Sequence, residues 1–153
     1  MKKTLKQLLK IAFVGVILTL IASCSKFESG GNTNKAKKNL TSVTWKLSTY
    51  FRNGVNETAT IHVSNWTEHY MTDGVLHLDF IDQNGDTQQQ TGAWELIDDN
   101  ANVKIDGVGS IDLSPQTGTV SASQIQILKL TKDEFWYSFT NGSDAHEFHL
   151  VPN

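Results

Sequence analysis

Residues 75–97 read VLHLDFIDQNGDTQQQTGAWELI, which is two alternating stretches joined by a short polar turn. Apolar and polar residues alternate in each stretch, which is the period-two pattern of a half-buried β-strand. The Asn84-Gly85 pair between them favours a tight hairpin, because both residues tolerate a positive φ. The residues that share one face are Leu76, Leu78 and Phe80 in the first stretch and Gly92, Trp94 and Leu96 in the second.

Short alternating stretches recur on both sides of this hairpin. Within 123–131 the alternation of apolar and polar residues shifts by one position between Ile127 and Leu128, which indicates a bulge or burial on both faces. Residues 52–72 are ambiguous, because 58–63 fits a strand whereas Asn65 and Glu68 fit the capping box of a short helix. We expect this segment to be a connection between strands, and whether it covers the mouth of the barrel stays open. Further strands are predicted over 43–51, 103–105, 108–113, 123–131, 134–140 and 145–151.

Short strands with tight turns, and no amphipathic helix of consequence, predict an all-β fold. The links between consecutive strands are too short to cross a sheet, which favours an antiparallel up-and-down arrangement over a Greek key. A β-sandwich remains the alternative.

Several motifs resemble those of the bacterial lipocalin-like lipoproteins, which are small anchored domains of the calycin barrel type. Trp-Lys-Leu near the start, Gly-x-Trp-Glu-Leu in the middle and Leu-Thr-x-Asp-Glu late in the chain occur in that order. The resemblance covers nearly all of residues 40–153 and implies an eight-stranded barrel. The chain has Val43-Thr44-Trp45 where eukaryotic lipocalins carry Gly-x-Trp. The stretches concerned are LTSVTWKLSTY (40–50), LHLDFIDQNGD (76–86), GAWELIDDN (92–100), ILKLTKDEFWYSF (127–139) and FHLVPN (148–153).

An eight-stranded barrel encloses a space that side chains can fill or that can hold one small ligand. We expect an apolar ligand pocket in which the Tyr137 hydroxyl meets a polar end of the ligand. The alternative is a barrel packed solid, which serves as a structural or protein-interaction subunit of a cell-envelope complex. The predicted pocket residues are Trp45, Phe80, Trp94, Tyr137 and Phe148.

Metal binding and catalysis have little support in the sequence. Asp82, Asn84 and Asp86 match the start of a calcium loop. The required glycine falls too early, at the fourth place of the pattern, Gly85, and Ala93 stands where the closing glutamate is needed, so a hairpin turn is predicted. His146 and His149 are three residues apart, and on a strand such side chains point to opposite faces. The chain has no Gly-x-Ser-x-Gly elbow. We therefore expect no metal, no cofactor and no enzymatic activity.

The N-terminal residues have the pattern of a secretory signal peptide, predicted over 1–23. Basic residues precede an apolar run over 11–22, which is shorter than the stretch of about 20 residues that spans a bilayer. Ile21-Ala22-Ser23-Cys24 resembles the bacterial lipobox, and this resemblance implies cleavage before Cys24 and acylation of its thiol and amino group. Several acyl chains together make a lasting membrane anchor.

The cysteine is followed by a polar stretch, and we expect residues 24–39 to form the lipidated cysteine and a flexible tether to a single domain over 40–153. Ser25 stands where an aspartate marks inner-membrane retention, so the predicted location is the bacterial envelope, at the outer membrane. Residues 40–153 carry 15 acidic and 5 basic side chains, a net charge of −10. Such a domain is a poor nucleic-acid binder, because affinity for phosphates comes from cations. The expected partners are the bilayer, a small apolar ligand and an envelope protein.

Overall fold

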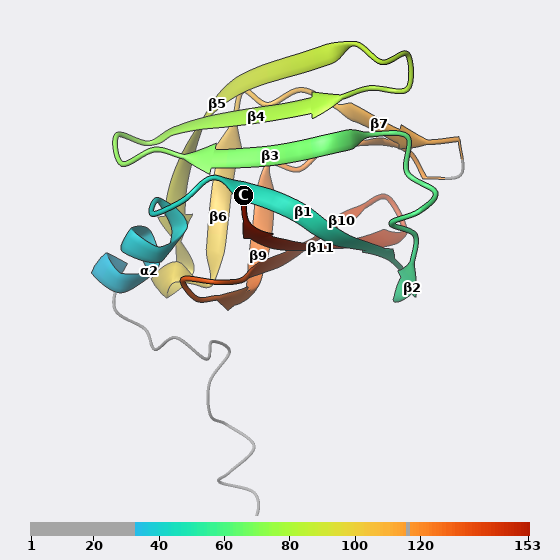
Figure 1. Ribbon diagram of the computed structural model, residues 1–153. Coiled ribbons are helices and arrows are strands. Elements are labelled where there is room, and N and C mark those ends of the chain that lie inside the picture. The colour runs from blue at the N-terminus through green and yellow to red at the C-terminus, as the bar shows by residue number, and fades with distance from the viewer. Residues whose placement is uncertain (1–32, 116) are drawn as a thin grey trace, which may run out of the picture.

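The structure, a computed structural model, describes residues 33–115 and 117–153. Its main body is an antiparallel barrel of eight strands (Figure 1), which follow one another round the barrel in chain order. The two-residue strand β2 (Val55–Asn56) pairs with the end of β1. The barrel strands are β1 (Trp45–Arg52), β3 (Ser64–Tyr70), β4 (Val75–Ile81), β5 (Thr87–Ile97), β6 (Asn102–Asp106), β9 (Gln124–Leu130), β10 (Phe135–Asn141) and β11 (Asp144–Pro152).

The first and last barrel strands close the sheet on itself. β1 pairs with β11 from Trp45 opposite Pro152 to Arg52 opposite His146. Closure removes the exposed sheet edges that an open sheet would present. The predicted eight-stranded, up-and-down, lipocalin-like barrel is therefore confirmed, and the sandwich alternative is wrong.

Residues 64–70, which the sequence leaves ambiguous, form the barrel strand β3. The expectation of a connection is therefore wrong for residues 64–70, and the short helix considered from Asn65 and Glu68 does not form there. Asn65 adopts a φ of 51°, and the register against β4 shifts by one residue between Ser64 and Thr67. Asn tolerates this left-handed conformation better than most residues, so it provides a β-bulge where a helix cap was considered.

Two further bulges reset which residues face the interior. In β9 the register against β10 skips Leu128, which confirms the slip predicted there. In β1 the register against β11 skips Ser48, so the side-chain phase changes within the strand. Tyr50, which simple alternation from Trp45 would place outside, is fully buried as a result.

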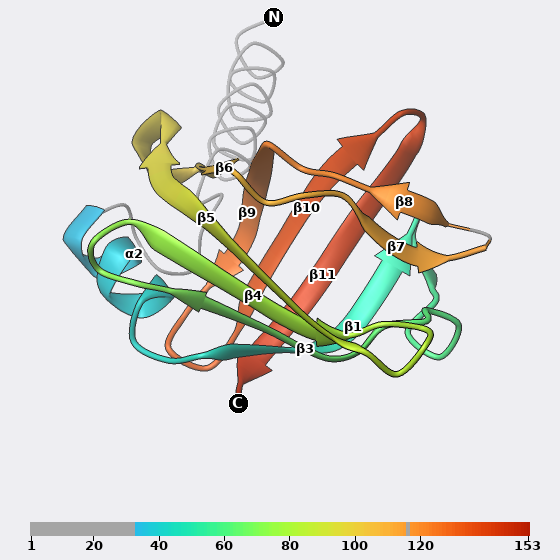
Figure 2. The same ribbon diagram turned by 90° about the horizontal axis from the view of Figure 1, so that it is seen from above.

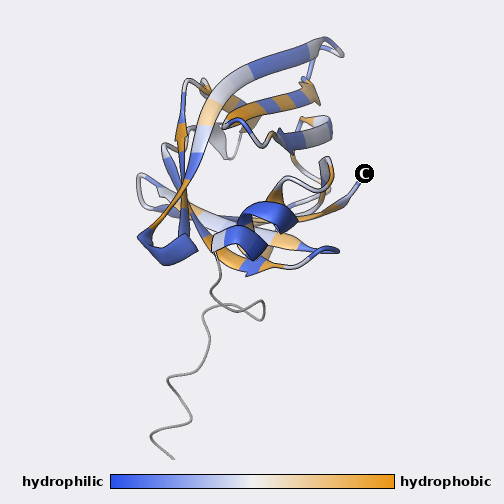
Figure 3. Ribbon diagram, turned by 90° about the vertical axis from the view of Figure 1, so that its left-hand side faces the viewer, coloured by the Kyte–Doolittle hydropathy of each residue, from blue (hydrophilic) through white to orange (hydrophobic). Residues whose placement is uncertain are grey.

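A helix, α2 (Thr33–Leu40), lies against one end of the barrel, as Figure 3 shows. Residues 33–39 were predicted to belong to a flexible tether, and for them that prediction is wrong. The helix is mostly polar, but Ala36 and Leu40 fall on one face and pack against the core. Its last carbonyl, that of Leu40, accepts a hydrogen bond from Trp45 Nε1 at 2.9 Å. These tertiary contacts, rather than helix propensity, hold the segment.

The predicted signal peptide, Cys24 and the start of the tether lie outside the described residues. Within residues 33–115 and 117–153, no helix has the length and apolar character needed to cross a bilayer.

A second, smaller sheet is separate from the barrel sheet in its strand pairing. Figure 2 shows it next to the end of β1. It consists of β7 (Ile111–Ser114) and β8 (Gly118–Val120). We call residues 107–115 and 117–123, which connect β6 to β9 through this hairpin, the lid hairpin. Between β5 and β6 the chain turns through the short segment η2 (Asp98–Asn100).

Candidate functional site

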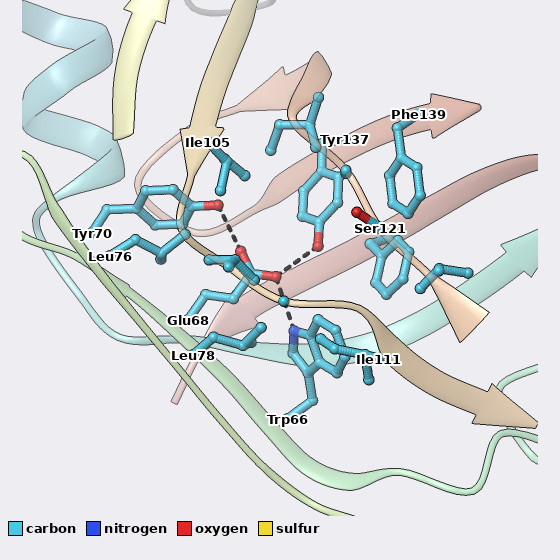
Figure 4. Close-up of a pocket in the computed structure, with 16 residues that line it drawn as sticks. Trp66, Glu68, Tyr70, Leu76, Leu78, Ile105, Ile111, Ser121, Tyr137 and Phe139 are labelled. Atoms are coloured by element: carbon cyan, nitrogen blue, oxygen red, sulfur yellow. Dashed lines mark hydrogen bonds between the residues drawn. The ribbon is translucent and has the colours of Figure 1, made fainter. Parts of the chain in front are cut away.

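The barrel interior contains a cavity of about 50 Å³ between the lid hairpin and strands β3, β4, β6, β9, β10 and β11. Its walls are almost entirely aromatic and aliphatic (Figure 4). A buried water needs roughly 10–15 Å³ on this kind of scale, so the cavity has room for a few small atoms beyond a single water. The lining residues include Trp66, Tyr70, Leu76, Leu78, Ile105, Ile111, Val120, Ile125, Tyr137, Phe139 and Phe148.

The lid hairpin covers the cavity with its own apolar side chains. Ile111 and Val120 are nearly fully buried and line the cavity from this side. Gly109 and Ser121 also line it but are exposed, so the mouth lies beside these two residues.

Hydrogen bonds fasten the lid hairpin to the barrel both at the mouth and away from it. At the mouth, the backbone N–H of Gly109 donates to Gln90 Oε1 on β5 at 2.7 Å. The backbone N–H of His62 donates to the carbonyl of Leu113. Asn141 Nδ2 donates to the carbonyl of Thr119 at 3.0 Å. The lid hairpin is therefore tied to the loop before β3 and to the end of β10.

Glu68 is the one carboxylate among the described residues that line the cavity. It lies on β3 between Trp66 and Tyr70, and because successive strand residues alternate, all three side chains point inward. Only 3% of Glu68 is exposed. A helix cap was one of the alternatives that the sequence left open for Glu68, and the structure places it inside the barrel.

Three neutral donors hold the Glu68 carboxylate, as the dashed lines in Figure 4 show. Trp66 Nε1 donates to Oε1 at 2.9 Å, and the Tyr137 hydroxyl donates to the same oxygen at 2.6 Å. The Tyr70 hydroxyl donates to Oε2 at 2.7 Å. Burial raises the pKa of Glu68 above its ordinary value, and these hydrogen bonds act in the opposite direction. Burial, with the nearby Glu68 charge, raises the pKa of both tyrosines well above 10.

Two of the five sequence-predicted pocket residues line this cavity. Tyr137 and Phe148 do so, and the Tyr137 hydroxyl already has Glu68 as its partner. The structure does not bring the other three to this cavity: Trp45, Phe80 and Trp94 are buried in the core but do not line it. The side chains of all five predicted residues point into the barrel. Alternation in the sequence does not show at which level along the barrel axis each side chain lies.

The cavity residue that sequence reasoning missed as a site residue is Glu68. Its signal is present in the pattern Trp66-x-Glu68-x-Tyr70, where a carboxylate takes an inward position between two aromatic residues. The bulge at Asn65 hides this pattern, because the strand then begins only at Ser64 and follows a segment without alternation.

His146 is a second buried polar group, near the other end of the barrel. Its Nδ1 lies 2.7 Å from the Tyr50 hydroxyl, and its Nε2 has no hydrogen-bond partner. Burial lowers the pKa of the His146 ring, so the neutral form is favoured. His149 points outward and stacks on Trp136 with ring centroids 4.0 Å apart. Among the described residues, no group of three or more His, Cys, Asp or Glu side chains is arranged to hold a metal ion.

The segment Asp82–Asp86 forms the hairpin turn between β4 and β5, as predicted. One oxygen of Asp82 accepts hydrogen bonds from the backbone N–H groups of Asn84 and Asp86, at 2.9 and 3.0 Å. The carboxylate that the calcium pattern would require as a ligand is thus used to stabilise the turn.

Strand order, closure and an interior cavity define a lipocalin-like barrel of the calycin type. No protein-family model matches the chain, and no curated protein sequence matches it.

The chain is similar to several solved structures, among them the following three. A lipocalin-like protein from Bacteroides uniformis is 13% identical, with 75% of this chain and 99% of that chain covered and a TM-score of 0.49. An uncharacterized protein from Bacteroides eggerthii is also 13% identical, with 72% of this chain and 98% of that chain covered and a TM-score of 0.46. Japanin from Rhipicephalus appendiculatus, solved bound to cholesterol, is 12% identical, with 81% of this chain and 77% of that chain covered and a TM-score of 0.46.

Proposed function

We propose that this protein is a lipid-anchored bacterial envelope protein whose barrel binds a small, largely apolar ligand beneath the lid hairpin. The observation that carries the proposal is the cavity, which combines aromatic and aliphatic walls with one convergent polar group, Glu68. Ligand sites in proteins commonly have this composition, because apolar walls supply affinity and a few polar groups fix orientation. The proposal assigns a binding role without catalysis.

The size of the cavity restricts the ligand. Pockets for drug-sized molecules commonly measure about 300–1,000 Å³, which is several times the 50 Å³ found here. A ligand therefore places one end in the cavity and extends through the mouth beside Gly109 and Ser121. A short amphiphile fits this description, whereas a large molecule held wholly inside the barrel does not.

Hexanol, a neutral short amphiphile, is a suitable probe of this site. We expect saturable chemical-shift changes in ¹H–¹⁵N NMR spectra, confined to residues that line the cavity. Ala122 is half-buried in the cavity wall, and Ala122→Leu places extra carbon atoms in the space that the probe needs. This variant is expected to weaken hexanol binding about tenfold or more, because a filled cavity cannot accept the probe without strain.

Val55→Leu is the matched control, since Val55 is 61% exposed and lies away from the cavity. It should bind hexanol as the wild type does. Shift changes scattered over the surface, or a linear response without saturation, would count against the proposed site.

The membrane anchor is proposed from the sequence pattern that ends at Cys24. A thiol at the end of a signal-like segment, followed by polar residues, fits acylation and attachment to the outer membrane. Cys24→Ser is expected to move the protein from the membrane fraction to the soluble fraction, because the acyl chains supply the hydrophobic attachment. Mass spectrometry of the wild type should show added acyl groups, and a serine variant that still sediments with membranes would refute the anchor.

The second candidate function is a protein-interaction subunit with a packed barrel. The small volume of the cavity favours it, because most of the interior is filled by side chains. Under this alternative the wild type shows no saturable hexanol binding, and one envelope protein co-purifies with it in a fixed ratio.

A further inference from the structure

The Glu68 carboxylate has hydrogen-bonding capacity left after its protein contacts are counted. An ionised carboxylate offers about four acceptor positions. Oε1 accepts from Trp66 and Tyr137, whereas Oε2 accepts only from Tyr70. One position on Oε2 therefore remains for a donor from a bound molecule. Figure 4 shows the carboxylate among the side chains that surround the cavity.

In its ionised form this carboxylate has no counter-charge among the described residues that line the cavity. Its three donors are a tryptophan and two tyrosines, all neutral, and no lysine or arginine is among the described residues that line the cavity. A buried charge is costly unless a charge of opposite sign accompanies it. A cationic group of a ligand would therefore be stabilised next to the ionised carboxylate.

The surrounding rings favour the same kind of occupant. Tyr137, Phe139 and Phe148 line the cavity from β10 and β11, and Trp66 and Tyr70 line it from β3. Aromatic faces carry partial negative charge and attract cations, most of all where water is excluded. Carboxylate and rings together therefore select against anions and in favour of cations.

We propose that Glu68 binds the cationic head of the ligand, and that the ligand is a protonated primary amine with a short apolar tail. This inference rests on the proposed ligand-binding function and assigns its chemical class. The ammonium group donates to Oε2, and the tail follows the aliphatic wall towards the mouth beside Gly109 and Ser121. An alkyl carboxylate of the same length would meet the charge of Glu68 and be repelled.

Three probes of equal length separate the possibilities: hexylamine, hexanol and hexanoate. At pH 7.5 hexylamine is protonated, because simple amines titrate near pH 10. We expect hexylamine to bind at least about tenfold more tightly than hexanol, since a charge-assisted hydrogen bond exceeds a neutral one by about that factor. Hexanoate should show no saturable binding in the same NMR titration.

Glu68→Gln is the decisive variant, because it keeps the shape of the side chain and removes the charge. It should weaken hexylamine binding by about tenfold or more and leave hexanol binding within about threefold of the wild type. Retained hexanol binding shows that the cavity is still folded. Glu95→Gln is the matched control, since Glu95 is exposed and pairs with Lys104 away from the cavity, and it should leave all three affinities unchanged.

The affinity of hexylamine should also fall as the pH is lowered. Burial raises the pKa of Glu68, so the carboxylate takes up a proton, and loses its attraction for the ammonium group, at a higher pH than an exposed glutamate would. The titratable groups that face Glu68 are the hydroxyls of Tyr70 and Tyr137, and both stay neutral over this range. Hexanol binding should change little, and Glu68→Gln should remove the pH dependence.

The outcomes distinguish this inference from the proposed function. If hexanol binds and hexylamine binds no more tightly, or if Glu68→Gln leaves hexylamine unaffected, the inference is overturned and the apolar site remains. If none of the three probes binds, the proposed function itself fails.

Discussion

Replacing Gly92 with alanine is expected to lower the free energy of unfolding by about 3 kcal/mol. A Cβ atom at this position would lie 2.5 Å from the carbonyl oxygen of Asp106 and 2.8 Å from Cγ2 of Val108. The first of these neighbours is backbone, which cannot move aside without disturbing the turn that leads from β6 into the lid hairpin. The close approach therefore requires glycine.

Chemical denaturation of both proteins measures this effect, and Gly109→Ala provides the matched control. A Cβ on Gly109 would lie 3.5 Å from the side-chain oxygen of Gln90, which is an ordinary contact. The control should change stability by less than about 1 kcal/mol. Equal stability of the two variants would show that the segment around Asp106 is not as closely packed as described.

Trp45→Ala is the second change with a large expected effect, a loss of about 4 kcal/mol. Trp45 is fully buried, packs against Phe135 with ring centroids 5.7 Å apart, and donates a hydrogen bond to Leu40 at the end of α2. Removing the indole leaves a large cavity between the helix and the barrel. Thermal or chemical unfolding monitored by circular dichroism would measure the loss.

Trp45→Phe separates packing from hydrogen bonding at the same position. It keeps most of the ring but leaves the Leu40 carbonyl without its donor, so a smaller loss of about 1–2 kcal/mol is expected. Because Trp45 does not line the cavity, this variant should bind hexanol as the wild type does. If the Trp45→Phe variant folds as the wild type does but binds hexanol more weakly, Trp45 belongs to the ligand site, as the sequence predicted.

The barrel was predictable from sequence wherever one face of a strand is buried and the other is solvated. The hairpin of β4 and β5 shows clear alternation and an Asn84-Gly85 turn, and β10 and β11 follow the same rule. Strand β3 was missed because the bulge at Asn65 interrupts the alternation at its start. Helix α2 was missed because its residues are polar, and only contacts distant in sequence make it stable.

The cavity was predictable only in part, for a geometric reason. Alternation shows that Tyr137 and Phe148 face inward, but Trp45, Phe80 and Trp94 face inward as well and fill other layers of the barrel. Which layer stays empty depends on where the lid hairpin lies, and that is fixed by contacts such as Asn141 with Thr119. A buried carboxylate is also contrary to the usual preference for exposure, so Glu68 was not expected inside.

The most direct test of the cavity as a ligand site is a crystal structure of the protein grown with hexylamine. Our account predicts the amine nitrogen within about 3 Å of Glu68 Oε2 and the alkyl chain directed towards the mouth beside Gly109 and Ser121. A structure in which the cavity holds only water or side chains, with hexylamine bound elsewhere or not at all, would contradict it.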